Sequence, residues 1–113
     1  MTMLPIFEDF VRACNENPRL RQMNRDWNRT IVIRTSDNGR CYWLQSENGL
    51  IQHGEGDRDN ADMRIEGSDK VIREVFSGAI SPTEPYNAGD LLVKGSQDDL
   101  VRLDIITLLI WGE

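Results

Sequence analysis

The sequence contains few of the residues on which most catalytic and metal sites depend. It has one histidine, His53, and two cysteines, Cys14 and Cys41, among 113 residues. A Ser-His-Asp triad or a histidine-based metal site needs partners for the histidine, and no convincing set can be built around His53. The two cysteines lack the spacing of a redox or metal-binding pair, so we expect two free thiols. We therefore predict that the protein is not an enzyme and has no metal or organic cofactor.

Positive charge is also in short supply. The chain has 13 lysine and arginine residues against 19 aspartate and glutamate residues, a net charge of -6. A nucleic-acid-binding protein needs a basic face to neutralise phosphates, and binding to anionic lipid by charge alone has the same requirement. No apolar run approaches the roughly 20 residues of a membrane span, and the first residues lack the basic segment of a signal peptide. We therefore expect a cytoplasmic protein with no nucleic-acid partner and no integral membrane segment.

Two loop segments look like ligand-binding motifs but lack essential residues. The run that starts at Asp57 resembles a calcium-binding loop, yet its sixth position is Asp62 instead of glycine and its twelfth is Ser68 instead of glutamate. The segment Gly54–Gly56 lacks the third glycine and the strand–helix setting of a nucleotide-binding loop. We interpret both segments as ordinary polar loops.

Length and hydrophobic pattern indicate one α+β domain over residues 1–113. A composition of 39% hydrophobic and 28% charged residues is typical of a soluble globular protein of this size. Apolar residues three and four apart predict helices over 2–15, 70–77 and 96–111, with short turns or helical links at 19–23 and 81–85. Alternation predicts strands over 29–35, 40–45, 50–53, 61–66 and 91–94. Two Asn-Gly turns join the first three strands into an antiparallel meander. This order predicts one sheet with helices gathered on one face.

Several residues suit the predicted helix ends. Thr2 can cap the first helix, and Pro5 lies where proline is tolerated in a first turn. Gly78 is placed to end the helix over 70–77. Ser96 and Asp99 have the spacing of a capping box at the start of the last helix.

The last helix is unusually apolar. Between Ile105 and Trp111, Thr107 is the only polar residue. A helix that lies on a sheet with its other side in water has one apolar stripe, so this one must bury more. A larger core, a second subunit or an apolar ligand could cover it. A chain this short has little core to spare, which favours the subunit or the ligand.

Three segments of the second half of the chain carry a family resemblance. They are the strand Ala61–Ile65, the helical segment Asp69–Gly78, and the run Gly89–Gly95 that follows Pro82. In their order and spacing these segments resemble the sterol carrier protein 2 family of lipid-binding domains. The turn and strand within residues 37–44 fit the early strands of the family more loosely.

The chain departs from the family pattern at two positions. Asp90 stands where the family usually has lysine, and Pro85 falls where a short connecting helix is usual. The two glycines at the ends of the last strand, Gly89 and Gly95, are expected where side chains would crowd the turns.

The resemblance implies a five-stranded mixed, mostly antiparallel sheet with an apolar tunnel between it and the helices. Members of the family bind acyl chains, sterols or other lipids and carry or present them without catalysis. On this basis the expected partner is a lipid or fatty-acyl ligand. The candidate lining residues are Ile31, Ile33, Tyr42, Leu44, Met63, Ile65, Phe76, Leu91, Val93, Leu103, Ile106 and Ile110.

Two other interpretations remain open. The tunnel could be filled, in which case the chain would be an interaction module that forms a homodimer through its C-terminal helix. The chain could also be an accessory subunit that presents an apolar substrate, such as a quinone precursor, to an enzyme.

Overall fold

The computed structural model describes residues 3–111, which form five helices and five strands. The helices are α1 (Leu4–Glu16), α2 (Pro18–Met23), α3 (Asp69–Phe76), α4 (Thr83–Ala88) and α5 (Gln97–Trp111). The strands are β1 (Arg29–Thr35), β2 (Arg40–Glu47), β3 (Leu50–Glu55), β4 (Met63–Gly67) and β5 (Leu91–Lys94). The predicted order of the elements is confirmed, and β1 and β5 have the predicted ends.

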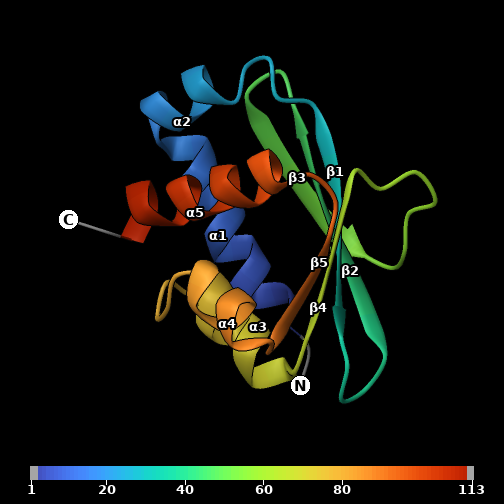
Figure 1. Ribbon diagram of the computed structural model, residues 1–113. Helices are drawn as coiled ribbons and strands as arrows, with labels where there is room; N and C mark the ends of the chain where they lie inside the picture. The colour runs from blue at the N-terminus through green and yellow to red at the C-terminus, as the bar shows by residue number, and fades with distance from the viewer. Residues whose placement is uncertain (1–2, 112–113) are drawn as a thin grey trace.

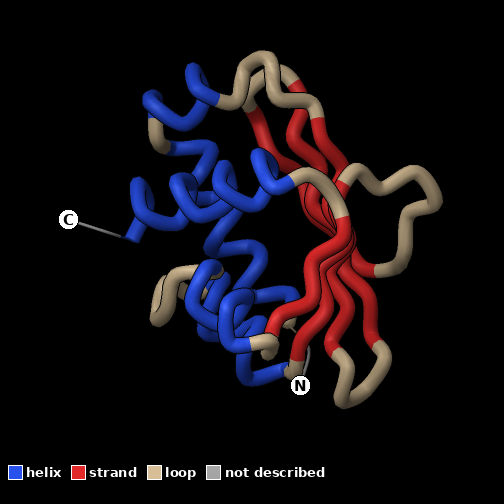
Figure 2. The backbone as a smooth tube through the Cα atoms, in the orientation of Figure 1, coloured by secondary structure: helices blue, strands red, loops and turns tan. Residues whose placement is uncertain are grey.

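The five strands form one sheet in the order β3-β2-β1-β4-β5. β1 runs antiparallel to β2 and parallel to β4, while β2 with β3 and β4 with β5 are antiparallel pairs. Figures 1 and 2 show the helices together on one side of this sheet. The chain therefore has the predicted α+β fold, a mixed and mostly antiparallel sheet with one face covered by helices.

Two local features differ from the sequence prediction. β4 begins at Met63, two residues later than expected, and Asp62 instead accepts a 2.8 Å hydrogen bond on its carboxylate from the backbone N–H of Thr30. The link predicted as a turn or helical link over 81–85 is helical, but its helix, α4, continues beyond Pro85 to Ala88. Pro85 is its third residue, and proline fits there because the first N–H groups of a helix have no partner within the helix.

The helix ends follow the predicted signals in part. The hydroxyl of Ser96 accepts a 3.1 Å hydrogen bond from the backbone N–H of Asp99 at the start of α5, as half of a capping box would. Gly78 follows α3 with a φ of +83°, and Pro5 lies in the first turn of α1. The predicted cap Thr2 lies outside the described residues.

One of the two glycines that flank β5 is required by crowding. A Cβ atom on Gly95 would lie 2.9 Å from the backbone oxygen of Asp62, so the prediction is confirmed there. A Cβ atom on Gly89 would meet nothing within 4 Å, so the crowding prediction is wrong at this position. Gly89 instead has a φ of +85°, a left-handed conformation that glycine adopts at no steric cost.

An aromatic cluster joins α1 and α3 to the sheet. The rings of Phe7 and Phe10 pack against Phe76, with centroids 5.1 and 5.2 Å apart. The ring of Phe7 also lies 5.2 Å from that of Tyr42 on β2. The hydroxyl of Tyr42 accepts a 3.3 Å hydrogen bond from the backbone N–H of Met3. The side chains of this cluster are all buried.

The loop between β3 and β4 lies on the side of the sheet that has no helices (Figure 1). The guanidinium of Arg58 is 3.9 Å from the ring centroid of Trp43, and Asp57 accepts a 3.0 Å hydrogen bond from Arg64. The backbone N–H of Arg58 and the side chain of Arg64 lower the pKa of Asp57. This carboxylate therefore ties the loop to β4.

Candidate functional site

α5 carries apolar side chains on two of its sides. Leu100, Leu103 and Ile106 are buried against the domain. Val101 and Leu108, on the other side, keep 50% and 63% of their surface exposed. A helix that packs on a single core needs only one apolar stripe. These residues form a second apolar stripe that no residue within 3–111 covers, so its burial by a partner or ligand stays a prediction.

A small cavity, called here the α5 cavity, lies between α5 and the sheet. Its volume is about 10 Å³, which is about enough for one water molecule. The lining residues are Phe10, Trp27, Ile31, Leu44, Ser46, Ile51, Leu103 and Ile106. All of them except Ser46 have apolar or aromatic side chains. A lipid chain does not fit this volume, so the site is closed in the conformation described.

Four of the twelve predicted lining residues border the α5 cavity: Ile31, Leu44, Leu103 and Ile106. Six others are buried in the continuous core around it: Ile33, Tyr42, Met63, Ile65, Phe76 and Leu91. Val93 and Ile110 are half-buried and pack against that core. The contact of these residues with a ligand stays a prediction.

Four residues that line the cavity were absent from the prediction. Strand alternation could have found Ser46, which lies two residues beyond Leu44 on the same face of β2. Phe10 lies on the predicted apolar stripe of the first helix, and Ile51 lies on the predicted third strand. Trp27 lies before β1, outside the predicted helices and strands, so no hydrophobic pattern indicates that it is buried. Its ring points inward because of a contact with the distant helix α5.

Polar contacts fix the N-terminal half of α5. The indole Nε1 of Trp27 and the Nε of Arg29 donate hydrogen bonds of 2.8 and 3.2 Å to the carboxylate of Asp99. Further along the helix, a guanidinium nitrogen of Arg102 donates a 2.8 Å hydrogen bond to the backbone oxygen of Met23. These contacts hold the N-terminal half of α5 beside the end of α2 and the start of β1.

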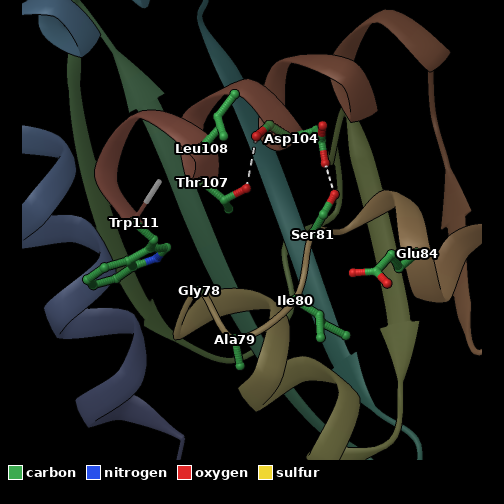
Figure 3. A pocket seen from close by; sticks show the side chains of 9 residues that line it. All are labelled: Gly78, Ala79, Ile80, Ser81, Glu84, Asp104, Thr107, Leu108 and Trp111. Carbon is green, nitrogen blue, oxygen red and sulfur yellow. Dashed lines mark hydrogen bonds between the residues drawn. The ribbon is translucent and has the colours of Figure 1, made fainter. Parts of the chain in front are cut away.

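The C-terminal half of α5 borders a pocket beside the link between α3 and α4 (Figure 3). The pocket has a volume of about 220 Å³ and is lined by Gly78, Ala79, Ile80, Ser81, Glu84, Asp104, Thr107, Leu108 and Trp111. The hydroxyl of Ser81 donates a hydrogen bond to the carboxylate of Asp104. The ring of Trp111 lies against Gly78 at one end of the pocket.

A more open hollow lies on the opposite side of the same half of α5, where α1 meets α2. It has a volume of about 440 Å³ and is lined by Ala13, Glu16, Asn17, Pro18, Arg19, Leu109 and Ile110. Hollows therefore border the C-terminal half of α5 on two sides, although the Ser81–Asp104 hydrogen bond ties the helix to the α3–α4 link.

The reactive groups of the described chain are dispersed. Within residues 3–111, no group of three or more His, Cys, Asp or Glu residues could hold a metal ion. Both cysteines are free, and burial raises the pKa of the Cys14 thiol to about 12. A thiol with this pKa is neutral at pH 7 and a poor nucleophile. Over the same range, no helix combines the length and hydrophobicity that crossing a membrane requires.

The part of the chain that matches a known protein family includes most of this site. The profile of the SCP-2 sterol transfer family matches residues 7–104. The chain belongs to this family. The matched range contains every residue that lines the α5 cavity except Ile106.

Solved structures with this SCP-2 fold resemble the chain at low sequence identity. The ubiquinone synthesis protein UbiJ-SCP2 has a TM-score of 0.78 at 12% identity, covering 96% of this chain and 94% of that chain. Sterol carrier protein 2 from Yarrowia lipolytica has a TM-score of 0.66 at 18% identity, covering 93% of this chain and 89% of that chain. These similarities establish the shared fold.

An enzyme domain has the same SCP-2 fold. A double mutant of the sec-alkyl sulfatase PisA1 matches with a TM-score of 0.78 at 11% identity and covers 100% of this chain. This chain spans only 17% of the length of that sulfatase. No curated protein matches the chain in sequence.

Proposed function

We propose that the chain binds an apolar, lipid-like ligand between the sheet and α5, and carries or presents it without converting it. Membership of the SCP-2 sterol transfer family supports a lipid or sterol-like ligand. The observation that carries the proposal is that α5, apolar on two sides, covers a cavity with an almost wholly apolar lining. Such a helix can exchange its contacts with the core for contacts with a lipid, because both are apolar.

The α5 cavity must enlarge to admit a ligand, and α5 is the element best placed to move. Its C-terminal half lies between two hollows and is tied to the α3–α4 link through Asp104 and Ser81. Its N-terminal half is held by the contacts of Trp27 and Arg102. If the C-terminal half of α5 swung outward about the N-terminal half, the cavity would open at Ile106. The contacts of Trp27 and Arg102 would stay in place.

The expected affinity suits a carrier. Burial of about ten methylene groups at roughly 0.8 kcal/mol each contributes about 8 kcal/mol before losses. That free energy corresponds to a dissociation constant of about 1 μM. A ligand held at this strength can still be released.

The small volume of the cavity favours a second candidate function. If the core stays filled, the chain would be an interaction module that forms a homodimer through α5. The outward stripe of Val101, Ile105 and Leu108 would then be buried between two copies.

A third candidate shares the ligand site but adds a partner. The chain would present an apolar substrate to an enzyme. The ubiquinone synthesis protein among the matched structures makes a quinone precursor a suitable ligand to test.

Titration with a fluorescent fatty alcohol tests the ligand-binding proposal. The wild-type chain should bind it saturably at a one-to-one ratio. Ile106→Phe should weaken binding about tenfold, because the larger side chain fills the cavity and overpacks the site. Ile105→Phe makes the same change on the exposed side of α5 and should leave binding unchanged. An absence of saturable binding, or equal effects of the two variants, would count against the proposal.

A further inference from the structure

One polar side chain interrupts the apolar lining of the α5 cavity. Ser46 lies on β2 and faces the helices, as Tyr42 and Leu44 do, and is only 3% exposed. Its hydroxyl oxygen has no hydrogen-bond partner among residues 3–111. Buried hydroxyl groups nearly always have a partner, because an unbonded one destabilises the fold. The hydroxyl of Ser46 is therefore available to a ligand that enters the cavity.

Ser46 also borders a polar hollow at the end of the sheet, called here the rim pocket. This pocket has a volume of about 260 Å³ and is lined by Asn28, Arg29, Thr30, Gln45, Ser46, Glu47, Asn48 and Asp62. Ser46 is the residue that the apolar α5 cavity and the polar rim pocket have in common. A ligand with its apolar body under α5 would have its polar end beside the Ser46 hydroxyl, next to the rim pocket.

The charges of the rim pocket favour a neutral polar end on the ligand. The guanidinium of Arg29 is already bonded to Asp99 and to the backbone oxygen of Asn28. Glu47 and Asp62 add two carboxylates to the lining. These carboxylates would repel a carboxylate on the ligand. A neutral hydroxyl or carbonyl oxygen can accept a hydrogen bond from the hydroxyl of Ser46 without this repulsion.

We propose that the Ser46 hydroxyl anchors the oxygen-bearing end of a neutral lipid, such as a long-chain alcohol, an ester or a quinone. This inference rests on the proposed ligand-binding function and adds the class of ligand and the residue that selects it. The hydroxyl of Ser46 donates a hydrogen bond to the ligand oxygen, at the boundary between the rim pocket and the α5 cavity. The hydrocarbon part of the ligand then lies against Ile31, Leu44 and the inner side of α5.

Competition binding with three matched ligands tests this assignment. A pyrene-labelled alkane serves as the probe, and its displacement is measured with tetradecanol, tetradecane and tetradecanoate. The measurement is made on the wild-type chain, Ser46→Ala and Ser46→Thr. Ser46→Ala should lower the preference for tetradecanol over tetradecane about fivefold, the contribution expected of one hydrogen bond. Ser46→Thr keeps a hydroxyl and should retain the preference. Comparison of ratios between variants cancels the different solubilities of the ligands. Tetradecanoate should bind the wild-type chain more weakly than tetradecanol.

Thr35→Val is the matched control. Thr35 is buried at the far end of β1, and its hydroxyl already bonds to the side chain of Asn38. This variant should lower the unfolding midpoint without changing the ligand preference. Ser46→Ala should raise the midpoint or leave it unchanged, because it removes an unbonded buried hydroxyl.

The outcomes separate the inference from the function on which it rests. If both tetradecanol and tetradecane bind, and their ratio is the same in the wild-type chain and Ser46→Ala, the anchor is wrong and the ligand-binding function stands. If no ligand displaces the probe from the wild-type chain, the proposed function fails together with the anchor. A preference for tetradecanoate would overturn the assignment of a neutral ligand.

Discussion

The indole Nε1 of Trp27 donates a 2.8 Å hydrogen bond to the carboxylate of Asp99, which lies 72 positions further along the chain. Asp99 is only 6% exposed, and its carboxylate accepts hydrogen bonds from this indole and from the Nε of Arg29, 3.2 Å away. A buried carboxylate that lost its donors would be costly. The pair therefore fixes the start of α5. Because Trp27 also lines the α5 cavity, it links the anchor of the helix to the candidate ligand site.

Trp27→Phe should remove this hydrogen bond, together with part of a ring that lines the α5 cavity and lies 5.4 Å from the guanidinium of Arg102. The carboxylate of Asp99 would lose one of its two side-chain donors, and the free energy of unfolding should fall by about 1–3 kcal/mol. Trp43→Phe is the control, because Trp43 is half-buried on the helix-free face and stacks with Arg58. Urea denaturation measures both variants. An equal loss in the two would contradict the role of the Trp27–Asp99 bond.

Gly78→Ala should detach Trp111 from the end of α3. Gly78 and Gly89 have φ values of +83° and +85°, so an alanine costs about 1–2 kcal/mol at either position. At Gly78 the added methyl group would also lie 2.2 Å from the Trp111 ring, whereas at Gly89 it would meet nothing within 4 Å. Gly78→Ala should therefore destabilise the fold more than Gly89→Ala and shift the tryptophan emission to longer wavelength. If Gly78→Ala and Gly89→Ala had the same stability and the same emission spectrum, the contact between Gly78 and Trp111 would be contradicted.

The buried thiol of Cys14 predicts a pH dependence of stability on the alkaline side. Its pKa is about 12 in the folded chain, against about 8.5 in an unfolded one. Between these values the unfolded chain releases a proton that the folded chain keeps, so stability falls as the pH rises. The loss approaches about 1.4 kcal/mol per pH unit. Urea denaturation of the wild-type chain and Cys14→Ala at pH 8 to 10 should give a steeper decline for the wild-type chain. Parallel declines would contradict burial of the thiol.

The outward stripe of α5 allows the two proposed functions, lipid carrier and dimeric interaction module, to be distinguished. Sedimentation velocity over a wide range of protein concentration should give the mass of one chain, and Leu108→Lys should not change it. Leu108 is the most exposed residue of the stripe, so lysine there does not disturb the core. A dimer in the wild-type chain that Leu108→Lys dissociates would favour the interaction module instead.

Much of the fold could be predicted because its signals are local. The Asn-Gly turn at 38–39 sets the first hairpin, and alternation along β2 places Tyr42 and Leu44 on the helix side. The course of α5 followed from its own apolar spacing. Pro85 departs from the family pattern, yet its first-turn position lets proline remain within α4.

The site was less predictable because it depends on contacts between distant residues. Nothing around Trp27 indicates that its ring turns inward, since the cause is Asp99 on α5. Asp99 itself had the spacing of a capping box, but its carboxylate bonds to Trp27 and Arg29. Ser46 has an unremarkable place in the sequence, and its unbonded hydroxyl becomes evident only when the surrounding core is known.

Native mass spectrometry of the gently purified chain, with organic extraction of what it releases, shows directly whether the chain holds a neutral lipid. We expect an equimolar adduct with the mass of a neutral lipid, which extraction removes and tetradecanol restores. A chain that carries no adduct and takes up no tetradecanol would rule out the ligand-binding proposal and favour the filled-core module.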